Sequence, residues 1–131
     1  MSPISAYTKV NVSTASARQI MVSLFQAALS NMRSAASAFE RGDYHTGSRM
    51  AEKAAAIVLG LQGTLNDDVA PDLCVRLRDL YTFVAWRLGM AGTRFSATHV
   101  REAERVFAPV AEAFIQAAAS LSDDIALSAA G

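Results

Sequence analysis

Residues 21–39, MVSLFQAALSNMRSAASAF, carry the pattern that decides the fold. Their apolar positions recur at alternating steps of four and three residues, at Met21, Phe25, Ala28, Met32, Ala35 and Phe39. Because an α-helix turns once every ~3.6 residues, this spacing places all of these side chains on one face. The stretch therefore predicts a long amphipathic helix, from about residue 17 to residue 41, with one face buried.

The polar residues before this helix predict where it begins. In VSTASARQI, residues 12–20, Ser16 can cap the free N–H groups of the first turn, and Gln19 can reach back to the Ser16 N–H. This is the Ser-x-x-Gln form of a capping box, in which the cap contributes about 1 kcal/mol. We therefore expect residues 1–15 to form a separate N-terminal arm, and Gly42 to end the helix in a left-handed conformation.

A second helix follows at once. Asp43 is a plausible N-cap, and the apolar pattern continues to about Gln62, before a connection through residues 63–68. Gly47 and Ala51 lie on the predicted inner face of this helix. Such small residues allow a neighbouring helix to approach closely.

The second half of the chain predicts two more helices. Pro71 fits the first turn of the third helix, where its missing N–H costs nothing. Either Ser96 or Thr98 can cap the fourth helix, and Pro109 inside it should bend it, because proline removes one backbone hydrogen bond. The small and polar residues 122–131 are expected to form a flexible C-terminal tail.

Four long amphipathic helices joined by short connections predict an all-α fold, an antiparallel up-down four-helix bundle over residues 16–121. The side chains expected in the core or at its border are Phe25, Leu61, Leu77, Tyr81, Phe107 and Phe114.

Composition narrows the class of protein. A length of 131 residues suits one domain. Twelve basic residues balance twelve acidic ones, and this net charge of zero argues against a nucleic-acid partner. The N-terminus resembles no signal peptide, and no apolar run approaches the ~20 residues that span a bilayer. With a single cysteine, the sequence predicts a cytoplasmic chain without disulfides and without membrane insertion.

The sequence offers little for catalysis. It contains no Glu-x-x-His pair, no glycine-rich phosphate loop and no paired cysteines, so we expect no metal, no cofactor and no enzymatic activity. Cys74 is expected to be a buried, inert thiol, and His99 a polar first-turn residue. His45 leaves a histidine phosphotransfer function open, although the surrounding glycine and lysine do not fit that class; the alternative is an exposed first-turn histidine.

Aromatic residues crowd the third predicted helix. Tyr81 continues its core stripe, whereas Phe83 and Trp86 lie off that stripe by about 100–160°. Two interpretations stay open for this pair: packing at the edge between two helices, or exposure in a groove that holds a partner helix.

Almost the whole chain, about residues 4–118, resembles the FliS family, the flagellar secretion chaperones for flagellin. The N-terminal matches are Ile4, Tyr7, Val10, Ala15, Ser16, Gln19, Ile20, Leu24 and Phe25. Further matches are Gly42-Asp43 at the first helix junction and Leu80-Tyr81, Arg87-Leu88 and Ala91 in the third helix. The chain departs from the family pattern at Ala17, Gln26-Ala27, Trp86, Gly92 and Pro109.

This resemblance implies a binding protein. FliS-like chaperones hold the disordered C-terminal segment of flagellin in the cytosol, prevent premature polymerisation, and present the subunit to the flagellar type III export gate; some relatives also bind the flagellar anti-sigma factor. The residues expected to contact the partner are Ile4, Tyr7, Ile20, Leu24, Tyr81, Phe83, Val84, Arg87 and Leu88. The alternatives to this chaperone are a histidine phosphotransfer-type protein and a generic four-helix adaptor.

Overall fold

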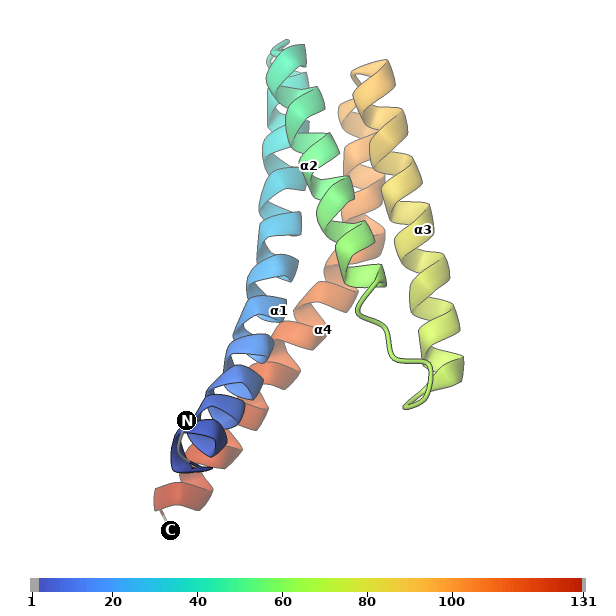
Figure 1. The fold of residues 1–131 in the computed structure, drawn as a ribbon. Helices are drawn as coiled ribbons and strands as arrows, with labels where there is room; N and C mark the ends of the chain where they lie inside the picture. The colour runs from blue at the N-terminus through green and yellow to red at the C-terminus, as the bar shows by residue number, and fades with distance from the viewer. Residues whose placement is uncertain (1–2, 131) are drawn as a thin grey trace.

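The computed structural model describes residues 3–130, and the side chains of residues 17–121. Within this part, the chain forms four α-helices: α1 (Pro3–Glu40), α2 (Tyr44–Gln62), α3 (Pro71–Arg94) and α4 (Ala97–Ala130). Each helix packs against the next, and α4 closes the ring against α1 (Figure 1). The predicted all-α, antiparallel four-helix architecture is confirmed.

Local sequence signals set the junctions between the helices. Gly42 has a φ of 82°, the left-handed conformation expected after the first helix. Asp43 is the N-cap of α2, and one of its carboxylate oxygens accepts a hydrogen bond from the Thr46 backbone N–H at 3.3 Å. Pro71 opens α3, and the Ser96 hydroxyl accepts a hydrogen bond from the His99 N–H at 3.3 Å. Ser96, rather than Thr98, therefore caps α4.

The predicted start of the first helix is wrong. α1 begins at Pro3 instead of Ala17, so Ser16 lies inside the helix and does not cap it. One reason is that neither glycine nor proline interrupts residues 4–41. The division into an arm, a bundle and a tail stays a prediction.

Aromatic and alanine side chains fill the centre of the bundle. The ring of Phe25 lies 5.8 Å from that of Phe107 and 4.7 Å from that of Phe114, and the Tyr81 ring lies 6.2 Å from Phe107. Leu61 is buried as well, whereas Leu77 and Phe114 pack against the border. All six predicted core residues are thus confirmed in the core or beside it.

Small residues bring α1 and α2 together. A methyl group added at Gly47 would lie only 2.4 Å from the nearest ring atom of Phe39. Ala51 and Ala54 are fully buried on the same face of α2. The predicted close approach of a neighbouring helix is therefore confirmed.

The helices differ greatly in length. α1 has 38 residues and α4 has 34, whereas α2 has 19 and α3 has 24. The first part of α1 and the last part of α4 therefore extend past the other two helices, and α4, which contains Pro109, changes direction along its length (Figure 1). No helix in the described part of the chain combines the length and apolarity needed to cross a bilayer.

Candidate partner-binding surface

The outer face of α3 exposes large apolar side chains. Val75, Phe83 and Trp86 are 54%, 42% and 56% exposed. They lie on the side of the helix opposite the buried stripe, because α3 turns by ~100° per residue. We call Val75, Phe83 and Trp86 the α3 stripe.

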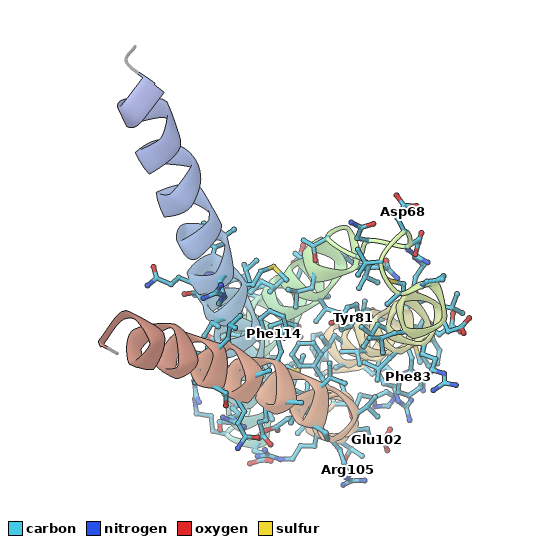
Figure 2. The ribbon with its side chains drawn as sticks, turned by 90° about the horizontal axis from the view of Figure 1, so that it is seen from below. Asp68, Tyr81, Phe83, Glu102, Arg105 and Phe114 are labelled. Carbon is cyan, nitrogen blue, oxygen red and sulfur yellow. The ribbon has the colours of Figure 1, made fainter. Side chains whose placement is uncertain are left out.

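Arg87 joins this stripe to α4. Its guanidinium carbon lies 6.0 Å from the centre of the Phe83 ring and 5.8 Å from that of the Trp86 ring, within the range of cation–π attraction. The same guanidinium forms an ion pair with the half-buried Glu102 of α4. Figure 2 labels Glu102 and Phe83. Glu102 therefore offsets the charge of Arg87 beside the stripe.

This pair also holds Arg87 in place. The Arg87 Nε is buried and has no hydrogen-bond partner among the described residues. An arginine fixed between two rings and a carboxylate supports the aromatic side chains instead of exposing a free charge. The stripe is therefore suited to bind another apolar surface.

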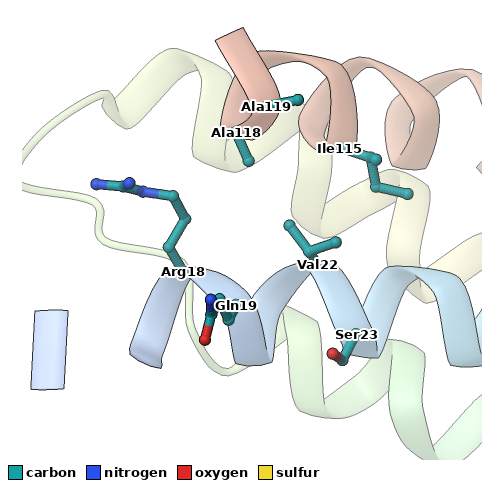
Figure 3. Close-up of a pocket in the computed structure, with 7 residues that line it drawn as sticks. All are labelled: Arg18, Gln19, Val22, Ser23, Ile115, Ala118 and Ala119. Atoms are coloured by element: carbon teal, nitrogen blue, oxygen red, sulfur yellow. The ribbon is translucent and has the colours of Figure 1, made fainter. Parts of the chain in front are cut away.

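A second apolar surface lies between α1 and α4, where these helices extend past the others. A cleft of about 440 Å³ opens there, lined by Arg18, Gln19, Val22, Ser23, Ile115, Ala118 and Ala119 (Figure 3). Val22 and Ala118 point toward each other across it. We call this the α1–α4 cleft; Ile20, which is 57% exposed, and Leu24, which is half-buried, do not line it.

The structure separates the residues predicted to contact a partner into three groups. Phe83 and Arg87 lie together on the outer face of α3, whereas Ile20 and Leu24 lie on α1, on a side of that helix that does not line the α1–α4 cleft. The side chains of Ile4 and Tyr7 are outside the described residues.

The third group belongs to the core. Tyr81 is 3% exposed, and Val84 and Leu88 are fully buried. Burial also raises the pKa of the Tyr81 hydroxyl. These three side chains would reach a partner only if the bundle opened.

Three residues of this surface, Val75, Trp86 and Glu102, were not among those predicted to contact a partner. The helical spacing already placed Trp86 away from the core, and the same spacing applied to Val75 would have found it. No sequence signal identified Glu102, because this residue lies on another helix and meets Arg87 only after α3 and α4 pack.

Among the described side chains, groups with reactive chemistry do not come together. Cys74 is buried, with its sulfur 3.3 Å from the Asn66 carbonyl oxygen, and His45 is exposed in the first turn of α2, both as predicted. His99 lies in the first turn of α4, with its Nδ1 2.8 Å from the Ser96 hydroxyl. No group of three His, Cys, Asp or Glu residues in the described part of the chain could hold a metal ion.

Comparison with known proteins agrees with a binding surface rather than a catalytic centre. Residues 1–121 match the sequence model of the family described as "Flagellar protein FliS". A relative, the "Flagellar secretion chaperone FliS" of Salmonella typhimurium, is 31% identical over 120 residues, covering 88% of this chain and 89% of that protein. The family match includes the α3 stripe and the α1–α4 cleft.

Proposed function

Since the chain belongs to the FliS family of flagellar secretion chaperones, which are not enzymes, we propose that it binds the C-terminal segment of flagellin in the cytoplasm. One chaperone binds one flagellin, prevents premature polymerisation, and delivers the subunit to the flagellar type III export gate. Neither a metal nor a cofactor takes part in this function.

The observation that carries the proposal is the α3 stripe. Phe83 and Trp86 are exposed although the core beneath them is complete, so neither ring is needed to fill the bundle. Their rings lie 6.5 Å apart and offer a continuous aromatic surface. An amphipathic segment that docks its apolar face on such a surface removes both faces from water.

The physical chemistry of a disordered partner suits a chaperone that must release it. A flagellin segment that becomes ordered on binding loses conformational entropy, which offsets part of the contact energy. Affinity then stays moderate for the area that is covered. The export gate can therefore remove the segment without having to overcome a very stable complex.

Ile20 and Leu24 supply a second, separate contact for the same segment, on α1. Ile4 and Tyr7, which lie further toward the N-terminus, are assigned to partner contacts by the family resemblance. Contacts with the export gate and with the flagellar anti-sigma factor belong to the same proposal.

Isothermal titration calorimetry of the full chain with the C-terminal peptide of the host's own flagellin tests this function. Wild type should bind with a stoichiometry of one. Phe83→Ala should weaken binding by about tenfold or more, since truncation of a central anchor costs ~1–2 kcal/mol. The matched control is Val69→Ala, because Val69 is 77% exposed and lies in the connection before α3, away from the stripe.

Three results would contradict the proposal. No heat and no complex with a folded chaperone would leave a generic four-helix adaptor. Equal losses in the Phe83 and Val69 variants would remove the α3 stripe from the site. Transfer of phosphate to His45 would favour the phosphotransfer class instead.

A further inference from the structure

A pocket between the end of α1 and the start of α2 carries basic and hydroxyl side chains. Its volume is about 440 Å³, and its lining is Arg33, Ser34, Ser37, Arg41, Thr46 and Met50. Two of these residues are arginines, and none is acidic. We call it the α1–α2 pocket; it shares no lining residue with the α1–α4 cleft or with the α3 stripe.

The helical repeat places the two arginines on either side of one point. Arg33, Ser37 and Arg41 follow one another at four-residue steps, so their side chains share one face of α1. At ~1.5 Å per residue, the two arginines begin about 12 Å apart along the helix, with Ser37 midway. Because both arginines line the pocket, a ligand seated over Ser37 can reach both of them.

Carboxylates hold both arginines in place without using all of their donors. The Nε of Arg33 pairs with Glu104 of α4 at 2.8 Å. One terminal nitrogen of Arg41 lies 3.5 Å from the Asp43 carboxylate. A guanidinium has five N–H donors, and the other nitrogens of these two arginines make no hydrogen bond within the described part of the chain. More than half of each arginine side chain is exposed, so these donors can meet a ligand.

The lining of the pocket defines the chemistry of its ligand. Guanidinium donors bind a carboxylate through parallel, charge-assisted hydrogen bonds, which is why arginine is frequent in sites for that group. Ser34 and Ser37 are exposed and make no side-chain hydrogen bond among the described residues, so their hydroxyls can donate to the same oxygens. The half-buried Met50 adds an apolar wall for the carbon chain that carries the carboxylate.

We propose that the α1–α2 pocket binds the free α-carboxylate at the end of the flagellin segment. This inference rests on the proposed function, because a C-terminal segment always ends in such a carboxylate. Arg33 and Arg41 donate to its oxygens from opposite ends of the pocket, and the serine hydroxyls donate beside them. The pocket thereby recognises the end of the partner chain, whereas the α3 stripe binds its apolar side chains.

One segment can reach both surfaces. α2 lies between α1 and α3 (Figure 1), and the axes of packed helices lie about 8–10 Å apart. A path over the outside of α2, from the α3 stripe to the pocket, is therefore on the order of 30 Å, which about ten extended residues span. A disordered partner that wraps around the bundle can follow such a path.

Isothermal titration calorimetry of the full chain with three forms of the C-terminal flagellin peptide tests the proposal. One form ends in its natural carboxylate, and the second ends in an amide, which removes the terminal charge. The amide should bind about tenfold more weakly than the acid, because the arginine–carboxylate contacts are lost. The third form, extended by three glycines, keeps the charge but moves it by up to ~10 Å, and it should bind as weakly as the amide.

Substitution of the arginines assigns this preference to the pocket. Arg33→Gln and Arg41→Gln, made singly, should each lower the preference for the acid from about tenfold to about threefold, and together they should abolish it. Binding of the amide should stay within about twofold of wild type in all three variants. Circular dichroism checks the fold, because these substitutions also break the pairs with Glu104 and Asp43.

Arg105→Gln is the matched control for each single variant. Arg105 is exposed on α4, forms no ion pair within the described chain, and does not line the pocket (Figure 2). Its substitution removes the same charge from the chaperone, so the preference for the acid peptide should stay at about tenfold. A preference that fell as far in this control as in the pocket variants would overturn the assignment to the α1–α2 pocket.

The outcomes separate this inference from the proposed function. If neither the acid nor the amide bound to a folded chain, flagellin binding and the carboxylate site would both be overturned. Equal binding of the acid and the amide would overturn the carboxylate site alone and leave flagellin binding intact. Arginine variants that weakened the acid and the amide alike would also overturn the site, because Arg33 and Arg41 would then act on another part of the segment or on the fold.

Discussion

The two faces of α3 belong to one helix but have opposite environments. Its inner face contains Val84 and Leu88, which are fully buried, whereas Phe83 and Trp86, one or two residues away in sequence, are 42% and 56% exposed. Both faces carry large apolar side chains, so hydrophobicity alone does not separate core from surface. The difference teaches that the core is complete without Phe83 and Trp86. Core packing therefore does not explain why the chain carries these two exposed rings.

Truncation of a core side chain should change the free energy of unfolding most. Phe107 is fully buried and packs against Phe25 and Tyr81, so Phe107→Ala should lower the free energy of unfolding by about 3–5 kcal/mol. Urea unfolding followed by circular dichroism measures this loss. A variant as stable as the parent would mean that the centre of the bundle is not packed as described.

Truncation on the outer side should separate stability from binding. Trp86→Ala should change the free energy of unfolding by no more than about 0.5 kcal/mol, because more than half of this side chain is already in water. The same variant should weaken binding of the flagellin peptide by about 1–2 kcal/mol in calorimetry. If Trp86→Ala lowered stability as much as a core variant, the stripe would be part of the core.

The helix caps belong to neither face of α3, and substitutions in them should change the stability of the fold least. Hydrogen bonds from Thr46 hold the pKa of the Asp43 carboxyl below its ordinary value of 3.8. The folded pKa is the lower one, so the cap stabilises the fold fully above pH 3.8, and this contribution is lost as the pH falls through the folded pKa.

Asp43→Ala should therefore lower the Tm modestly at neutral pH, and less as the medium becomes more acidic. Thermal unfolding of both chains at pH 7 and between pH 5 and pH 2 measures the difference. A gap in Tm that widened toward acid would contradict the assigned direction of the shift. The exposed Arg41, 3.5 Å from the same carboxylate, adds little to this cap.

Much of the fold could be predicted from single elements of sequence. The three- and four-residue spacing from Met21 to Phe39 fixed the buried face of α1, and Gly42 with Asp43 fixed its junction with α2. These predictions succeeded because periodicity and capping depend on residues close together in the chain. The prediction for the start of α1 failed because a capping box expresses only a local preference. The helix continues through it.

The candidate site was harder to predict. Phe83 and Trp86 were placed off the core stripe by spacing alone, yet spacing left open whether another helix covered them. Val84, Tyr81 and Leu88 were predicted as partner contacts by the family resemblance, and the packing of α3 against its neighbours buries all three.

The sequence by itself determined that this chain forms amphipathic helices, where most of them are joined, and which residues face inward, since these properties follow from the helical repeat and local hydrogen bonds. Only the tertiary structure decided that α1 and α4 extend past α2 and α3, that Arg87 meets Glu102, and that the α3 stripe is exposed. These features join residues distant in the chain. They depend on how whole helices pack, which no short stretch of sequence specifies.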